Sequence, residues 1–145
     1  MTIKTLSYRS LQPGPTFTVL GAVHGNEPCG AAAINRLIAD LDRGEVVLTQ
    51  GALQLVPVCN PRAYAENVRF VERNLNRSLY PKDKPVHYED RIDPILCDVL
   101  DRSNVVLDLH SYASQGGPFM FLSAQNADET QFAYALGVKI GRAHV

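Results

Sequence analysis

The sequence predicts an α/β fold in which helices cover a mixed, largely parallel sheet. Short apolar segments rich in β-branched residues occur at residues 17–23, 53–58 and 105–109, and their length is typical of buried strands. Between them, residues 31–41 and 91–100 carry apolar side chains three and four positions apart, which is helical periodicity. Strands that alternate with helices along a chain are typical of α/β layers.

Turn residues and prolines set the bounds of the first strand and the first helix. The strand at residues 17–23 follows Pro13-Gly14-Pro15, a sequence typical of a turn. Pro28 and Gly30 indicate the start of the helix, because the fixed φ of proline suits a first helical turn. Gly44 is expected to end it. The apolar face of this helix comprises Ile34, Leu37, Ile38 and Leu41.

The later elements are predicted from similar signals. Pro57 has no N–H to donate, so it indicates a strand end or an edge in the segment 53–58. Pro94 fits best in the first turn of the helix at residues 91–100. Residues 62–88 have little apolar periodicity and are expected to form a long loop, of a kind that is often functional. Further elements are expected as strands at residues 105–109 and 119–122 and a helix at 129–136.

Charge and cysteine content argue against several classes of protein. The 145 residues suit one domain, and 14 Lys and Arg against 15 Asp and Glu leave no basic surface for nucleic acid or a membrane. Neither a signal-peptide pattern nor an apolar run of membrane-spanning length is present, which favours a cytoplasmic protein. Three cysteines without a C-x-x-C pair predict neither a disulfide framework nor a thiolate zinc site.

Three potential metal ligands follow two of the predicted strands. His24 and Glu27 come after the strand at residues 17–23, and His110 comes directly after the strand at 105–109. Active sites of α/β sheets gather at the carboxyl ends of strands. Two His and one Glu are a common ligand set for catalytic zinc, which keeps one position open for water. A His-x-x-Glu match is weak by itself, and the alternative is that His24 and Glu27 are ordinary loop residues.

Four segments occur in a recognisable order along the chain. They are Gly21-Ala22-Val23-His24-Gly25-Asn26-Glu27, Asn60-Pro61-Arg62-Ala63, Asn74-Leu75-Asn76-Arg77 and Asp108-Leu109-His110-Ser111. In these segments the chain resembles the succinylglutamate desuccinylase/aspartoacylase family, relatives of the zinc carboxypeptidases. The resemblance implies a zinc carboxypeptidase-like fold, one Zn²⁺ ion on His24, Glu27 and His110, and hydrolysis of the amide bond of a small N-acyl amino acid.

The resemblance also gives roles to three residues of the long loop. Arg69 resembles the arginine that stabilises negative charge on the attacked carbonyl oxygen, a catalytic role that favours the transition state over the ground state. Asn76 and Arg77 match the pair that binds the free carboxylate of the substrate, for which the two-pronged guanidinium is well suited. The alternative for each arginine is a solvated surface charge. Solvated surface positions are expected for Arg62, Arg73 and His87.

Asp108 lies two positions before His110, so on a strand both side chains point to the same face. Two interpretations remain open for it. It accepts the spare imidazole N–H of a metal ligand, a common support for such histidines, or it caps a neighbouring turn.

The general base of the family is a Glu well beyond the last zinc ligand, on a part of the domain that continues past residue 145. After His110 this chain has one Glu, Glu129, which matches no family motif. Residues 1–139 are therefore expected to be the N-terminal part of the catalytic domain, truncated and inactive. The same ligands also serve a carboxypeptidase-like peptide hydrolase, and the missing Glu favours a non-catalytic metal- or ligand-binding module.

The last six residues, Ile140 to Val145, match the translation of a common sequencing adapter. The adapter codons ATC-GGA-AGA-GCA-CAC-GTC are followed by a stop codon, and the preceding AG completes a codon for Lys139. We expect residues 140–145 to be a non-native tail, so His144 is not expected to be a ligand.

Overall fold

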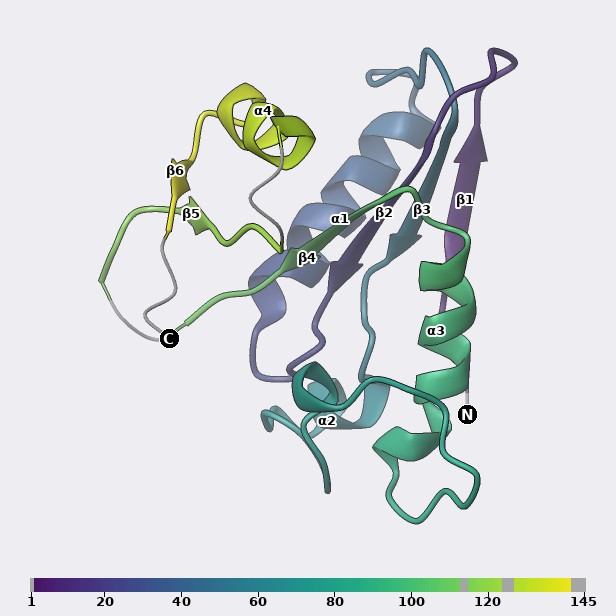
Figure 1. Cartoon of the computed structure of the whole chain (residues 1–145), viewed down its shortest axis with the longest axis vertical. Helices are drawn as coiled ribbons and strands as arrows, with labels where there is room; N and C mark the ends of the chain where they lie inside the picture. Colours follow the sequence, from purple (N-terminus) through teal and green to yellow (C-terminus); the bar gives the residue numbers. More distant parts are fainter. Residues whose placement is uncertain (1, 113–114, 124–126, 142–145) are drawn as a thin grey trace. The chain divides into compact units, whose positions relative to one another are not determined.

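The computed structural model describes residues 2–112, 115–123 and 127–141. The chain divides into two compact units, Met1–Tyr112 and Ala113–Val145. The first unit contains a four-stranded sheet of β1 (Leu6–Arg9), β2 (Thr16–Gly21), β3 (Ala52–Val56) and β4 (Val105–Leu109), in the order β1-β3-β2-β4 (Figure 1). Strand β2 is parallel to β3 and β4, and β1 is antiparallel to β3. The predicted mixed, largely parallel α/β fold is confirmed.

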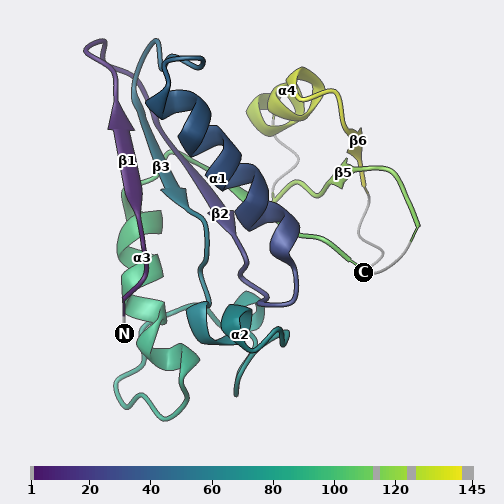
Figure 2. The same cartoon turned by 180° about the vertical axis from the view of Figure 1, so that it is seen from behind.

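Two helices cover opposite faces of this sheet. Figure 1 views it from the side of α3 (Asp93–Asp101), and Figure 2 from the side of α1 (Pro28–Asp42). Successive residues of a strand point to opposite faces. Accordingly, Val19 of β2 joins a buried cluster with Ile34 of α1, whereas Leu20 joins a second cluster with Leu96 of α3. Strand β2 thus contributes to both cores.

The ends of α1 follow the sequence signals. Pro28 lies in the first turn, and Gly44, at φ +72°, donates its N–H to the carbonyl of Leu41 just beyond the helix end. A Cβ on Gly30 would lie 2.8 Å from the Cβ of Leu109. Only glycine therefore lets the first turn of α1 approach the end of β4 so closely.

The predictions for Pro57 and Pro94 are also confirmed. Strand β3 ends at Val56, directly before Pro57. Pro94 lies in the first turn of α3, which begins at Asp93 because the preceding residues form the 3₁₀ turn η2 (Glu89–Arg91).

Two parts of the first unit differ from the sequence predictions. Strand β1 was not predicted, because its four residues give little periodic signal. Its extended conformation depends on pairing with β3. The long loop expected at residues 62–88 contains most of α2 (Pro61–Ala65) and the 3₁₀ turn η1 (Leu75–Arg77). Asparagine side chains cap both, since Asn60 accepts from the N–H of Ala63 and Asn74 from that of Asn76. Such caps stabilise short helical turns even where the sequence has no apolar periodicity.

The second unit contains β5 (Phe119–Met120), α4 (Ala127–Ala135) and β6 (Lys139–Ile140), and β5 pairs with β6 in parallel. The predicted strand at 119–122 is shorter than expected, and β6 was not predicted. His144 lies outside the described residues. Across the described parts of the chain, no helix is long and apolar enough to cross a membrane. All three cysteines are free thiols: Cys29 is exposed, Cys59 is buried and Cys97 is partly buried.

Candidate metal centre

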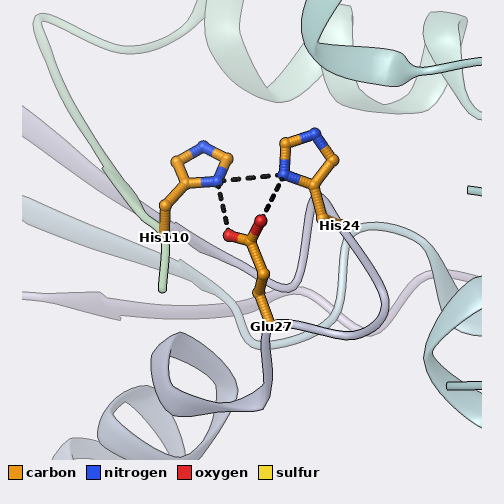
Figure 3. Close-up of side chains that lie close together, drawn as sticks. All are labelled: His24, Glu27 and His110. Atoms are coloured by element: carbon orange, nitrogen blue, oxygen red, sulfur yellow. Dashed lines mark hydrogen bonds and ion pairs between the residues drawn. The ribbon is translucent and has the colours of Figure 1, made fainter. Parts of the chain in front are cut away.

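The side chains of His24, Glu27 and His110 converge at one end of the sheet (Figure 3). His24 follows β2, Glu27 precedes α1, and His110 follows β4. Strands β2 and β4 are parallel neighbours with Gly21 paired to Leu109, so the residues after them emerge side by side. Glu27 Oε1 lies 2.9 Å from His24 Nδ1, and its Oε2 lies 2.9 Å from His110 Nδ1. The two Nδ1 atoms are 3.2 Å apart.

The turn that carries His24 and Glu27 is shaped by its backbone contacts. Ala22 has φ +45°, a left-handed conformation that is uncommon for a residue with a Cβ. The N–H of Glu27 donates to the carbonyl of His24 at 3.1 Å. A Cβ on Gly25 would lie 2.0 Å from the carbonyl carbon of Ala63 in α2. Glycine is required there because α2 packs directly against this turn.

Both histidines are held through the ring nitrogen that faces away from Glu27. His24 Nε2 lies 3.0 Å from Asn74 Oδ1, an atom that also accepts the backbone N–H of Asn76 at 2.9 Å and is thereby identified as the oxygen. His24 Nε2 is therefore the protonated nitrogen. His110 Nε2 lies 2.7 Å from Asp108 Oδ2, so it also donates. The structure therefore shows the first of the two interpretations of Asp108, in which its carboxylate accepts the spare imidazole N–H of His110.

This hydrogen bonding leaves three acceptor atoms facing one another. In the neutral rings, both Nδ1 lone pairs point toward the carboxylate of Glu27, an arrangement that is repulsive without a cation between them. Atoms bound tetrahedrally to one zinc ion at about 2.1 Å lie about 3.4 Å apart. The observed separations of 2.9 to 3.2 Å are close to this value. The three residues thus fit a divalent metal ion in donor type and in spacing.

The local electrostatics favour the metal-binding protonation states of two of these residues. Burial lowers the pKa of His24, which is 2% exposed. Burial raises the pKa of Glu27, but the hydrogen bond from the Ser111 N–H and the contact with the His110 ring outweigh it and hold the pKa below its usual value. The hydrogen bond to Asp108 raises the pKa of His110. At neutral pH, Glu27 is therefore ionised and His24 is neutral.

The structure brings Arg69 to this cluster. Its Nη1 donates to Glu27 Oε1 at 2.8 Å, while almost half of its side chain stays exposed. Asn76 and Arg77 are exposed and border a hollow of about 190 Å³ that Asp108 also lines. The apolar side chains of Leu20, Leu75 and Leu96 also line this hollow.

One surface prediction is wrong. Arg73 is largely buried, and its guanidinium pairs with Asp90 at 2.8 Å and with Asp93 at 2.7 Å. Both carboxylates are buried, and a buried charge needs a partner of opposite sign. Arg62 and His87 are exposed as predicted, and Arg62 pairs with Glu66.

Sequence reasoning missed three residues that support the cluster. Asn74 holds His24, the backbone N–H of Ser111 binds Glu27, and the buried Glu89 binds the loop that carries Arg69. Asn74 opens the segment Asn-Leu-Asn-Arg, and an Asn before a short turn is a signal for a cap. Neither Ser111, which acts through its backbone, nor Glu89 has a local sequence signal.

Comparisons with known proteins agree with this geometry. A family model described as the succinylglutamate desuccinylase/aspartoacylase catalytic domain matches residues 13–141. The N-alpha-acetyl-L-2,4-diaminobutyric acid deacetylase of Halomonas elongata is 36% identical over 102 residues, which cover 68% of this chain and 29% of that protein. The aspartoacylase of Xenopus tropicalis is 27% identical over 134 residues, which cover 84% of this chain and 42% of that protein.

A solved structure is similar over most of the chain. An aspartoacylase family protein from Mesorhizobium loti, 26% identical, superposes with a TM-score of 0.73 over 94% of this chain and 44% of its own. The chain spans less than half the length of each of these three relatives. The sheet, the converging side chains and the match over residues 13–141 lead to one conclusion: the chain belongs to the succinylglutamate desuccinylase/aspartoacylase family.

Proposed function

We propose that this chain is the metal-binding part of a zinc-dependent hydrolase that cleaves the amide bond of a small N-acyl amino acid. His24, Glu27 and His110 are the proposed ligands of one Zn²⁺ ion. The observation that carries the proposal is the convergence of two Nδ1 lone pairs on a carboxylate, with each Nε2–H held by a separate oxygen. The deacetylase and aspartoacylase names of the relatives support the amide substrate.

A bound zinc ion would supply a water of lowered pKa and polarise the carbonyl group. The residues of this chain would bind and orient the substrate. In the proposed roles, Arg69 stabilises negative charge on the carbonyl oxygen, and Asn76 with Arg77 binds the free carboxylate at the rim of the hollow. Asp108 keeps His110 in the tautomer whose Nδ1 is free.

We further propose that the general base lies in a part of the protein beyond residues 1–139. Within the described part of the first unit, Glu27 and Asp108 are the carboxylates at the cluster. Glu27 is a proposed metal ligand, and Asp108 already accepts the hydrogen bond from His110 Nε2. This chain alone is then expected to bind zinc without turnover. We also propose that residues 140–145 are non-native. Resequencing the gene tests this, and different codons with a native stop would overturn it.

Zinc binding is the first test of the proposed ligands. Metal analysis of the purified chain is expected to give one zinc ion per chain, and His24→Ala, Glu27→Ala and His110→Ala are each expected to abolish it. His87→Ala, which removes an exposed histidine, is the control. A wild-type chain that binds no zinc would overturn the proposal.

Activity is tested on the protein expressed from its complete reading frame. Release of amino acid from a panel of N-acyl amino acids should stop on chelation and return with zinc. Arg69→Ala is expected to lower kcat by about 100-fold or more, as for other donors to a developing oxyanion. Cleavage of peptides alone would favour a carboxypeptidase-like hydrolase, and zinc binding without turnover would favour a non-catalytic module. Either result would replace the proposed reaction.

A further inference from the structure

The loop that contains Arg69 touches the metal cluster at two separated points. We call residues 67–78 the arginine loop. Near its start, Arg69 donates to Glu27 Oε1 at 2.8 Å, and its carbonyl accepts the N–H of Gly25 at 3.2 Å. Further along, Asn74 accepts from His24 Nε2 at 3.0 Å. The segment between these two contacts, residues 70–73, must therefore be fixed for both to form.

A single carboxylate holds that segment. Glu89 accepts the backbone N–H groups of three consecutive residues, Val71 at 2.7 Å, Glu72 at 3.2 Å and Arg73 at 3.0 Å. The Glu89 side chain is fully buried. Burial raises its pKa, but the hydrogen bonds from Val71, Asn60 and the other two donors outweigh this and keep the pKa below its usual value. Glu89 is therefore ionised at neutral pH, with both oxygens used as acceptors.

Asn60 orients this carboxylate and links it to the turn that carries His24. Its Nδ2 donates to Glu89 Oε1 at 3.1 Å, and its Oδ1 caps α2 by accepting the N–H of Ala63. Its backbone N–H donates to the carbonyl of Ala22 at 3.1 Å, two residues before His24. Asn60 is fully buried and lies in the Asn-Pro-Arg-Ala segment, for which the proposed reaction gives no use.

We propose that Glu89, oriented by Asn60, is a positioning residue that holds the arginine loop so that Arg69 and Asn74 meet the metal ligands. The expected effect of Glu89 on zinc affinity rests on the proposed function, whereas its expected effect on the position of the arginine loop does not. Removing the carboxylate releases both contacts together, because the three anchored amides lie between them along the chain.

Glu89→Gln tests this role with the smallest change in side-chain shape. The amide has the same shape, but one of its oxygens becomes an NH₂ group. In one orientation that group opposes the donors of Val71 and Asn60, and in the other it opposes those of Glu72 and Arg73. Neither orientation satisfies all four donors. We expect amide hydrogen exchange at residues 71–73 to accelerate about tenfold or more, and zinc affinity to fall about tenfold.

Controls separate positioning from general stability. Asp98→Asn removes an exposed carboxylate on α3 that pairs with Arg102, and it should match the wild type in both measurements. Asn60→Ser is a milder variant, since a serine still caps a helix but cannot reach Glu89 as a donor. It should give a smaller loss, and it keeps the question answerable if Glu89→Gln does not fold.

A double variant tests the pairing directly. Asn60→Asp alone places a carboxylate oxygen where Asn60 Nδ2 now lies, 3.1 Å from Glu89 Oε1, so that two carboxylates repel each other. Adding Glu89→Gln reverses the donor and acceptor and allows three of the four hydrogen bonds to form. Zinc affinity and amide protection should both recover partly relative to Asn60→Asp. No recovery would count against the pairing.

The outcomes distinguish this inference from the proposed function. If the wild type binds no zinc, the proposed function fails, and local amide exchange alone decides whether Glu89 fixes the loop. If the wild type binds zinc and Glu89→Gln binds it equally well, the positioning role of Glu89 is refuted and the proposed function stands. Exchange that accelerates equally throughout the chain would show general support of the fold and would also overturn the inference.

Discussion

At the scale of single residues, the two histidines of the cluster are supported by acceptors of different charge. A neutral amide, Asn74, holds His24, whereas a carboxylate, Asp108, holds His110. Both acceptors fix a tautomer and favour the protonated ring through their hydrogen bond, but only the carboxylate adds the attraction of a negative charge. The two histidines should therefore respond differently to substitution of their partners.

Asn74→Ala is expected to weaken zinc binding by about 10- to 100-fold, the usual cost of losing a partner that orients a metal ligand. Without the Asn74 oxygen, the His24 ring is free to exchange tautomers and to turn away from Glu27. Competition with a chromophoric chelator measures the affinity. Asn35→Ala, an exposed substitution on α1, is the control and should leave the affinity unchanged.

The raised pKa of His110 predicts a pH dependence of zinc binding. A protonated imidazole cannot ligate zinc, so protons should compete with the metal until the pH exceeds the pKa of His110. Asp108→Asn removes the main cause of the raised pKa, so its affinity should level off at a lower pH. The level reached should also be lower, because the ring loses its carboxylate partner. Titrations between about pH 5 and pH 9 test both effects. Identical profiles would refute the assigned role of Asp108.

At the scale of elements, β2, β3, β4 and the main helices could be predicted, but the strand β1 and the arrangement around the arginine loop could not. Short apolar runs rich in β-branched residues located β2 and β4, and the rule that sites gather at strand ends then predicted that His24 and His110 lie together. The fold of residues 62–88 depends on buried groups such as Glu89 and Arg73, whose partners lie 16 to 20 positions away. No local pattern encodes such contacts.

The contact between α2 and the turn at Gly25 gives a test at this scale. Gly25→Ala is expected to destabilise the fold by about 3 kcal/mol or more, because its Cβ would overlap the α2 backbone at Ala63. Urea unfolding measures the change, and zinc affinity should fall with it. Gly117→Ala, where a Cβ would meet no atom within 4 Å, is the matched control. Equal stability of the two variants would contradict the packing described.

The carboxylate of Asp90 in η2 predicts a loss of stability in acid. Hydrogen bonds from the N–H groups of His87 and Val86, together with Arg73, lower its pKa from 3.8 to about 2. A lowered folded-state pKa stabilises the fold above the unfolded value, so this contribution is complete above pH 3.8 and is lost as the pH falls to about 2. The difference in unfolding free energy between the wild type and Asp90→Asn should shrink across this range. A constant difference would contradict the assignment.

At the scale of the whole molecule, β4 is an edge strand of the four-stranded sheet. Val105 and Val106 on this strand are 39% and 44% exposed. Unpaired edges with exposed apolar residues favour association with other chains. This chain is therefore expected to fold weakly and to self-associate, and Val106→Lys should reduce association in analytical ultracentrifugation. A monomeric wild type that melts cooperatively would refute this expectation.

The sequence distance between the cluster's members has a consequence for folding. His24 and Glu27 belong to one turn, whereas His110 lies 83 positions from Glu27. An ion shared by all three would cross-link the chain as a disulfide does, closing a long loop and restricting the unfolded state. It would also fasten the edge strand β4 to β2. The complete ligand set exists only after β4 has docked, so the rate of zinc capture during refolding would report the docking of that strand.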